Sequence, residues 1–308
     1  MLPPARSHRD AAMLLSIVIP TFRRPESLAG LLDELERQMR PLQESVELIV
    51  VDNCPKQSAA DVVHGHAAQP RYVAEMRPGI AHARNTGLRA ARGKYVIFID
   101  DDQRPQHRWL SHYLDMALGG NEVCFGPVLP EFERPAPDEL HAVVSALFTR
   151  DLGLKTGADV TQLRAYLGTG NSMFDRLRCF PQDDPFDPRF NHGGEDVWLL
   201  RQLAADHGLR FSWCAEAAVR EIVPAARMTV EYVRKRRFRN GQLRCIVEAG
   251  GRRWGAILVW MIVGLGQTFV YGGASLVLLP FNGRGSAALV AKSFGGLGKI
   301  LWWLPFRP

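Results

Sequence analysis

Cysteine is sparse in this chain of 308 residues, and the cysteines that it has are scattered. Their number is odd and no two of them form a C-x-x-C pair; they are Cys54, Cys124, Cys179, Cys214 and Cys245. This pattern indicates neither a disulfide framework nor a zinc site, and it fits a reducing compartment.

We also expect no secretory signal peptide at the N-terminus. Arg6 and Arg9 precede an apolar segment over residues 11–20, but that segment is short and β-rich. It is followed by two arginines without a small-residue cleavage site. The segment therefore predicts a first strand, with residues 1–13 as an N-terminal extension.

Charge is absent from a long segment near the C-terminus. Residues 255–280 contain no Asp, Glu, Lys or Arg. As a helix this segment would reach about 39 Å, more than the roughly 30 Å of a bilayer core. A second apolar stretch, residues 287–306, is interrupted by Lys292 and Lys299. We predict a membrane-associated region over residues 251–308. It could span the membrane, lie in its interface, or be a pair of helices packed on the domain.

Basic residues are concentrated directly before this apolar segment. Residues 227–253 contain nine Arg or Lys against two Glu, whereas the whole chain has a net charge of only +6. Such a block suggests phosphates or an anionic membrane surface rather than nucleic acid. Because basic flanking residues favour the cytoplasmic side, we expect the protein at the cytoplasmic face of the inner (plasma) membrane.

The first hundred residues alternate between strand and helix patterns. Strand-like apolar runs occupy residues 14–19, 46–51, 72–74 and 95–99, and the first is expected to stop at Pro20. Helices are predicted over residues 25–39, from about residue 58, and over residues 80–91. This alternation is typical of a parallel sheet covered by helices, in which Asp52 and Asp100 project from the same edge.

Three consecutive carboxylates, Asp100, Asp101 and Asp102, follow the last of these strands. They repel one another unless a cation lies among them, so a divalent ion is the expected partner. Because side chains alternate along a strand, Asp100 and Asp102 can face one way while Asp101 faces the other and supports the loop. A solvated acidic turn after a core strand is the alternative.

Six short motifs follow one another in an order that resembles family 2 glycosyltransferases of the GT-A fold. They are residues 19–24 (IPTFRR), 50–53 (VVDN), 83–87 (ARNTG), 98–102 (FIDDD), 168–172 (GTGNS) and 193–196 (GGED). The resemblance is closest to bacterial enzymes of succinoglycan-type exopolysaccharide synthesis. It implies a GT-A domain over residues 14–250, with a Rossmann-like, mostly parallel α/β sheet flanked by helices. Hydrophobic, membrane-associated helices would follow at the C-terminus.

The same resemblance implies a donor site for a UDP-sugar. Thr21 and Asp52 would hold the uracil and ribose, Asp100 would lie on the nucleotide side, and Asp102 would bind Mg²⁺ or Mn²⁺ at the diphosphate. Further nucleotide-sugar contacts are implied for Pro20, Arg23, Arg84, Asn85, Asp101 and Arg237. For Arg84, the alternative is an arginine on a helix surface that is exposed to solvent.

The acceptor side maps onto two later motifs. By resemblance, Asp196 is the base that takes the proton of the acceptor hydroxyl, and Glu195 orients the acceptor. Gly170 and Asn171 would lie beside the acceptor and the donor sugar. The alternatives are that the two carboxylates only favour a helix N-terminus, and that Asn171 only supports a hairpin turn.

Together these features predict a metal-dependent, inverting glycosyltransferase. It would move a hexose from a UDP-sugar to a glycan or lipid-linked oligosaccharide acceptor. Membrane lipids and other polysaccharide-assembly proteins are the expected partners, and nucleic acid is not one. A third protein ligand for the metal stays open, because Arg220 or Glu221 stands where relatives often carry a His.

Two other classes of protein share some of these features. A sugar nucleotidyltransferase has the sheet and the metal-binding acids, but it has no use for Glu195 and Asp196 or for a membrane tail. A non-catalytic, membrane-tethered module that binds glycans or cations would not need Asp52, Asp102 and Asp196 to converge.

Overall fold

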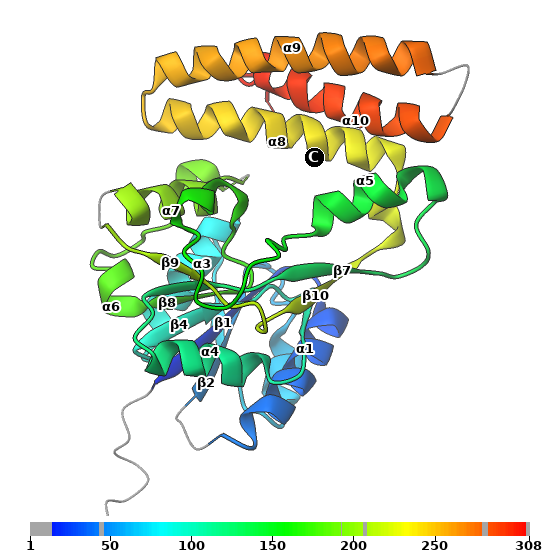
Figure 1. Ribbon diagram of the computed structural model, residues 1–308. Coiled ribbons are helices and arrows are strands. Elements are labelled where there is room, and N and C mark those ends of the chain that lie inside the picture. The colour runs from blue at the N-terminus through cyan, green and yellow to red at the C-terminus, as the bar shows by residue number, and fades with distance from the viewer. Residues whose placement is uncertain (1–13, 43–45, 192, 206–207, 279–282, 306–308) are drawn as a thin grey trace, which may run out of the picture. The chain divides into compact units, whose positions relative to one another are not determined.

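The computed structural model describes residues 14–42, 46–191, 193–205, 208–278 and 283–305 (Figure 1). Contacts divide the chain into two compact units, Met1–Leu129 with Arg150–Arg220 and Pro130–Thr149 with Glu221–Pro308. The predicted domains, 1–13, 14–250 and 251–308, follow composition rather than contacts, and they stay a prediction.

The first unit is built on a seven-stranded sheet with the order β3-β2-β1-β4-β8-β6-β9. Neighbouring strands run parallel except at β8, which is antiparallel to both β4 and β6. The predicted mostly parallel sheet is therefore confirmed, with one reversed strand. The strands are β1 (Leu15–Thr21), β2 (Val46–Asp52), β3 (Arg71–Ala74), β4 (Tyr95–Phe98), β6 (Val123–Phe125), β8 (Ser172–Asp175) and β9 (Phe211–Trp213).

A separate three-stranded sheet has the order β5-β10-β7. Its strands are β5 (Gln103–Pro105), β7 (Val128–Phe132) and β10 (Val219–Val223). Along β7 and again along β10, the chain passes from the first unit into the second.

Helices cover both faces of the large sheet (Figure 1). Ile17 and Ile19 of β1 belong to a core with α1, α2 and α4, whereas Val18 between them packs with α3 and α7. This division follows from the alternation of side chains along a strand. The helices are α1 (Pro25–Met39), α2 (Ala60–Gly65), α3 (Ile80–Ala90), α4 (Trp109–Leu118), α6 (Arg176–Cys179) and α7 (Glu195–Ala205), with 3-10 helices η1 (Thr161–Tyr166) and η2 (Pro188–Phe190).

The sequence predicted that the first strand stops at Pro20, and this prediction is wrong. Pro20 lies inside β1 opposite Val51, and the strand ends at Thr21. The Thr21 carbonyl accepts a hydrogen bond from the Asn53 amide over 3.0 Å on the β2 side, so Pro20 turns its nitrogen the other way. On that side β4 has already ended, at Phe98. A proline is tolerated because the strand needs no donor there.

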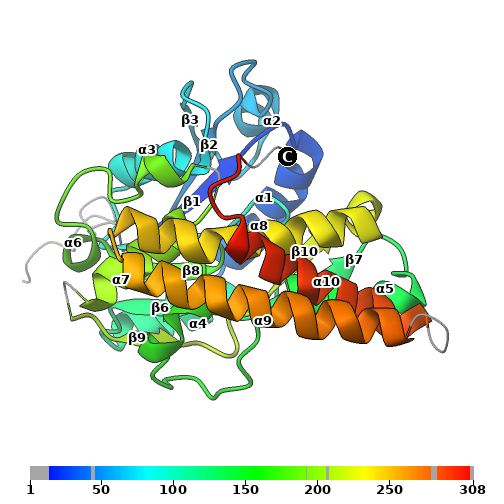
Figure 2. The same ribbon diagram turned by 90° about the horizontal axis from the view of Figure 1, so that it is seen from above.

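The second unit is mainly helical. Three of its helices, α8, α9 and α10, lie side by side (Figures 1 and 2). Apolar residues of α5, α8 and α10 share a core that includes Val144, Val233 and Ala291. Among the described residues, only Trp254–Val277 is long and apolar enough to cross a membrane, judged by length and composition. The elements are α5 (Asp138–Phe148), η3 (Ala225–Arg227), α8 (Val230–Gly250), α9 (Trp254–Leu278) and α10 (Gly283–Ile300).

Candidate active site

The carboxyl ends of three parallel strands carry the residues predicted to bind the donor. Thr21 is the last residue of β1 and lies opposite Asp52, the last residue of β2. Asp100 follows β4 after one further residue. Parallel strands present these ends at one edge of the sheet, which is where open α/β sheets bind ligands.

Asp101 is turned into the protein at this edge. It is 4% exposed, and its Oδ2 accepts a hydrogen bond from Thr21 Oγ1 over 2.7 Å. Ser27 Oγ donates to the Asp101 carbonyl over 2.9 Å. Burial raises the pKa of the Asp101 carboxyl to about 6, although Arg24 and Thr21 act in the opposite direction. These contacts fix the turn that follows β4.

Arg24 is a site residue that the sequence reasoning did not select. Its Nη1 lies 2.9 Å from Asp101 Oδ1 and 2.6 Å from Asp102 Oδ2, so one guanidinium bridges two acids of the turn. The neighbouring Arg23, which was selected, is exposed and lies over the Phe22 ring at 4.9 Å. No local sequence signal separates the two arginines, because the backbone of the turn before α1 decides which side chain reaches the acids.

Asp52 is fully buried, and its carboxylate is hydrogen-bonded within the protein. Its Oδ1 accepts from the Cys54 amide over 2.9 Å, and its Oδ2 accepts from the Ala59 amide over 2.7 Å. The Tyr72 hydroxyl also donates to Oδ2, over 3.2 Å. Burial, together with Asp52, raises the pKa of Tyr72 to about 12. In this structure Asp52 therefore orders the loop after β2, and its role toward a nucleotide stays a prediction.

A buried arginine links the acids of two distant motifs. Arg84 Nη1 lies 2.5 Å from Glu195 Oε1, and Arg84 Nη2 lies 3.4 Å from Asp100 Oδ1. The side chains of Arg84 and Glu195 are each 6% exposed, which removes the alternative of a solvated helical arginine. Burial, with a smaller contribution from Asp196, raises the pKa of Glu195 to about 7, against the lowering effect of Arg84.

Glu195 and Asp196 are the first two residues of α7. The glycines before them, Gly193 and Gly194, have φ angles of 116° and 97°, a region that side-chain-bearing residues rarely adopt. Asp196 Oδ1 accepts a hydrogen bond from the Val197 amide over 2.7 Å. Its Oδ2 lies next to Gly168, where an added Cβ would come within 3.0 Å. The base candidate is therefore beside the glycine-rich segment of residues 168–172.

Asn171 holds that segment in place. Its Nδ2 donates to the carbonyls of Pro127 and Ala217, both over 2.9 Å. Its Oδ1 accepts from Trp109 Nε1 over 2.8 Å and from the Tyr113 hydroxyl over 3.0 Å. These contacts favour the alternative in which Asn171 supports the loop, and its predicted acceptor contact is untested.

Gly170 approaches the acids of the turn closely. A Cβ added there would lie 2.2 Å from Asp100 Oδ2, so a larger residue would displace that carboxylate. Arg150, which the sequence gave no reason to select, donates from Nη1 to the Gly168 carbonyl over 2.7 Å. From Nη2 it donates to the carbonyls of Gly170 and Asn171. The segment is thus held against the turn by backbone and side-chain contacts.

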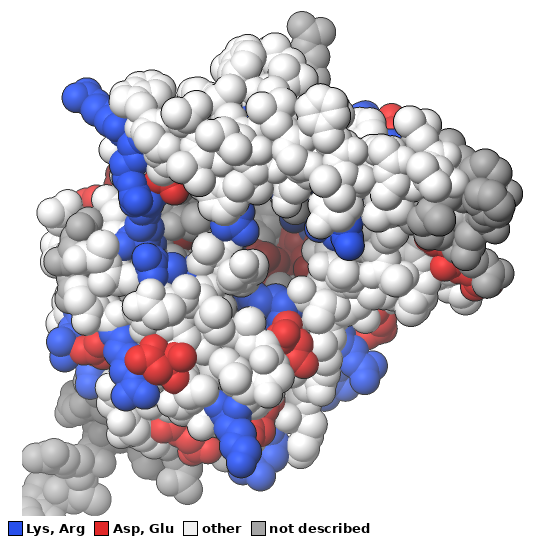
Figure 3. Space-filling model, turned by 45° about the horizontal axis from the view of Figure 1, so that its top comes forward, with Lys and Arg blue, Asp and Glu red and all other residues white. Residues whose placement is uncertain are grey.

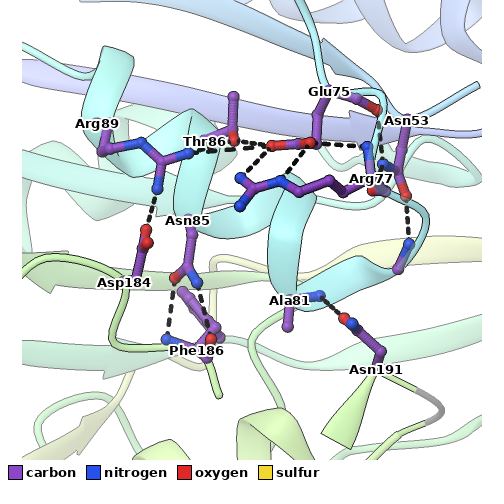
Figure 4. Close-up of polar contacts among 11 residues, drawn as sticks. Asn53, Glu75, Arg77, Ala81, Asn85, Thr86, Arg89, Asp184, Phe186 and Asn191 are labelled. Carbon is purple, nitrogen blue, oxygen red and sulfur yellow. Dashed lines mark hydrogen bonds and ion pairs between the residues drawn. The ribbon is translucent and has the colours of Figure 1, made fainter. Parts of the chain in front are cut away.

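Asn85 pairs with the backbone of Phe186 (Figure 4), and its predicted contact with the nucleotide-sugar stays a prediction. Its Nδ2 donates to the Phe186 carbonyl over 2.7 Å, and its Oδ1 accepts from the Phe186 amide over 3.0 Å. Nearby, Glu75 forms a second polar cluster with Arg77 and Thr86. Arg77 hydrogen bonds lower the pKa of Glu75 to about 2.

The remaining predicted donor residue, Arg237, lies on α8 in the second unit. Its contact with the diphosphate stays a prediction. Glu221, one of the two residues at the expected position of a further metal ligand, lies 3.7 Å from Arg227.

The acids of the turn fit a divalent cation, with few ligands from the protein. Asp102 Oδ2 already holds a positive group, the Arg24 guanidinium, and carboxylate oxygens are the ligands that Mg²⁺ and Mn²⁺ prefer. Among the described residues, three metal-binding side chains converge only at Asp33, Glu36 and His66. None of these three belongs to the turn of residues 100–102. An ion on Asp102 would therefore draw most of its ligands from the diphosphate and water.

Comparison with known proteins gives a consistent family. Residues 16–166 match the model of Glycosyl transferase family 2. The succinoglycan biosynthesis protein ExoM of Rhizobium meliloti is 28% identical over 254 residues, which are 74% of this chain and 73% of ExoM. A crystal structure of S. aureus TarS 1–349 in complex with UDP covers 93% of this chain and 90% of its own, with a TM-score of 0.55 and 17% identity. The same protein in complex with UDP-GlcNAc matches with a TM-score of 0.54 and 15% identity, over 92% of this chain and 90% of its own.

Proposed function

Because residues 16–166 match the model of glycosyl transferase family 2, we propose that this chain is an inverting transferase that uses a UDP-sugar and a divalent cation. The acceptor is a glycan or a lipid-linked oligosaccharide, and the reaction serves polysaccharide assembly. The similarity to ExoM supports a polysaccharide as the product, and the TarS complexes support UDP as the nucleotide of the donor.

One observation carries the proposal: Arg84 joins Asp100 and Glu195. Asp100 belongs to the turn proposed to bind the metal, and Glu195 precedes the proposed base by one residue. Nothing in a simple ion-binding module requires these two motifs to share one buried arginine. In a transferase such a link serves the reaction, because the donor and the acceptor must be held in register for an in-line displacement.

The chemistry assigned to these residues is a single displacement. The acceptor hydroxyl oxygen forms a bond to the anomeric carbon as the bond from that carbon to the phosphate oxygen breaks. Asp196 takes the hydroxyl proton, and the electron pair of the broken bond leaves with UDP. Attack from the face opposite the leaving group inverts the anomeric configuration.

Other side chains orient the reactants. Asp102 would hold the divalent cation, which when bound neutralises charge on the departing diphosphate. Glu195, held by Arg84, is placed to orient the acceptor hydroxyl. Arg84 places a positive charge between the two acids before the reaction begins. Because this charge is already in position, the solvent does not have to reorganise around it during the reaction.

The C-terminal unit is assigned to the cytoplasmic face of the membrane. The uncharged helix α9 follows a block of basic residues, an arrangement that suits an anionic lipid surface. A lipid-linked acceptor would be presented at that surface.

The test is a screen of UDP-sugars with the full chain, with Mg²⁺ or Mn²⁺, that follows release of UDP. Asp196→Asn should reduce transfer by at least about 100-fold, as expected for loss of a general base, and should leave UDP binding unchanged. Asp61→Asn removes an exposed carboxylate of α2 and is the matched control. No turnover of any UDP-sugar would refute the proposal, and loss of UDP binding in Asp196→Asn would remove Asp196 from the base role.

A further inference from the structure

The outward face of α9 is a continuous apolar stripe. Its exposed residues are spaced by three, four or seven positions, so they share one face of the helix. Phe269 is the most exposed of them, at 76%. In Figure 3 the surface over the uppermost helix layer carries few charged side chains, and α9 itself has none among its residues. The stripe consists of Leu258, Ile262, Leu265, Phe269 and Leu276, flanked by Val259, Val270 and Val277.

The opposite face of α9 carries both apolar and polar side chains, among them Ile257 and Ser275, and packs tightly against α10. An added Cβ on Gly264 would lie 2.7 Å from the Gly296 carbonyl, so the two backbones are in close contact. Lys299 Nζ donates to Gln267 Oε1 over 2.7 Å and lies 5.9 Å from the centre of the Trp260 ring. The protein-facing side of α9 therefore contacts a cation that belongs to α10, Lys299.

α10 is bound to α8 in the same close manner. An added Cβ on Gly241 of α8 would lie 2.2 Å from the Gly295 carbonyl. The three helices thus form one layer and must enter a bilayer together or not at all. α8 contains six basic residues in its central part: Arg234, Lys235, Arg236, Arg237, Arg239 and Arg244.

A spanning orientation of α9 conflicts with this layer. α8 and α10 run beside α9 in Figures 1 and 2, so a perpendicular layer would carry their cations across the hydrocarbon core. Charged side chains at that depth are costly, and α8 carries six basic residues in its central part. An orientation parallel to the surface keeps them at the level of the headgroups.

We propose that α9 lies in the plane of an anionic bilayer, with its stripe of residues 258–277 in the acyl region of one leaflet. This deepens the membrane association proposed above. The charge pattern selects lipid as the occupant. The stripe is uncharged, while Arg252 and Arg253 at its start are exposed and basic. Exposed Trp254 and Trp303 are aromatic residues of the kind enriched at the membrane interface.

Probe depth along α9 separates an in-plane helix from a spanning one. The five native cysteines are buried, so a cysteine introduced at the surface can be labelled selectively. Leu258→Cys, Leu265→Cys, Phe269→Cys and Leu276→Cys, each carrying a fluorophore, sample about 27 Å of helix. The full chain is bound to vesicles of equal parts phosphatidylcholine and phosphatidylglycerol, and quenching by lipids brominated at shallow and deep positions is compared.

An in-plane helix gives the same depth at all four positions. A spanning helix gives shallow probes at residues 258 and 276 and deep ones between them, and that result would overturn the proposal. Probes that are not quenched, in a protein that sediments as a dimer, would assign the stripe to a second copy of the chain. UDP release is measured on the same samples, so a uniformly quenched but inactive enzyme would count against the proposed function alone.

A charge inserted into the stripe supplies an independent measurement. Phe269→Asp should weaken binding to these vesicles by at least tenfold. Leu118→Asp changes a leucine that is 66% exposed on α4 in the first unit and should leave binding unchanged. Equal binding by the two variants, with helix content preserved in both, would contradict the assignment of the stripe to lipid.

Discussion

Replacing Arg84 by methionine should make the stability of the protein depend strongly on pH. The substitution keeps an unbranched apolar stem but removes the guanidinium that lies 2.5 Å from Glu195 Oε1. Because both side chains are 6% exposed, water cannot take its place. Removing one partner of a buried pair costs about 3–5 kcal/mol when the remaining charge persists. We expect that loss in the free energy of unfolding at pH 8 and above.

The direction of the pH effect follows from the pKa of Glu195. Burial and Asp196 raise this pKa from its ordinary value of 4.5 to about 7 in the folded protein. A carboxyl with a raised folded pKa binds more protons when folded, so its contribution to stability is lost as the pH rises from 4.5 through 7. Without Arg84, the pKa of Glu195 in the folded protein rises further. Each further pKa unit lowers the free energy of unfolding above that pKa by about 1.4 kcal/mol. The difference between variant and wild type should therefore be small at pH 5 and grow up to pH 8.

Urea unfolding followed by tryptophan fluorescence at pH 5, 6, 7 and 8 measures this difference. Arg89→Met is the matched control on the same helix. Arg89 is 38% exposed and pairs with Asp184, which is 49% exposed, so its loss should cost at most about 1 kcal/mol at every pH. Adding Glu195→Gln to Arg84→Met should remove most of the pH dependence. A loss in Arg84→Met that is independent of pH and no larger than in Arg89→Met would refute the reasoning.

Two further predictions concern the turn and the segment beside it. Arg24→Gln removes the cation that lies 2.6 Å from Asp102 Oδ2, so Mn²⁺ should bind about fivefold more tightly without nucleotide, as a partly exposed ion pair of about 1 kcal/mol implies. Electron paramagnetic resonance of free Mn²⁺ measures this, and unchanged affinity would show that Arg24 and the ion do not compete. Asn171→Ala leaves four buried hydrogen-bond partners unsatisfied at a residue with a φ of 64°, and should lower the unfolding free energy by about 3 kcal/mol or more. A loss below about 1 kcal/mol in urea unfolding would contradict this account of the loop.

Local signals were sufficient for much of the first unit. The helix predicted over residues 25–39 is α1, because Pro25 opens it and four leucines at helical spacing face the core. The strand before the three acids is buried on both faces, as its unbroken apolar run predicted. These features depend on neighbours along the chain, and the sequence displays those neighbours directly.

Features that depend on distant partners could not be predicted in the same way. Nothing in residues 172–175 shows that β8 is antiparallel and lies between β4 and β6. The choice of Arg24 over Arg23 depends on which side chain the turn before α1 directs toward Asp102. Arg150 binds backbone carbonyl oxygens. Every residue type has a backbone carbonyl, so no sequence motif marks these partners. Burial of the Arg84 pair was likewise hidden, because its partner is 111 positions away.

The reversed strand β8 has a consequence for turnover. β8 is hydrogen-bonded along β4, and the Asn171 amide donates to the Phe98 carbonyl over 2.9 Å. The segment proposed to face the acceptor and the turn proposed to face the donor are thus joined by the hydrogen bonds between β4 and β8. They cannot move apart as two separate rigid bodies. Admission of sugar and release of UDP must therefore come from movement other than a separation of these two segments.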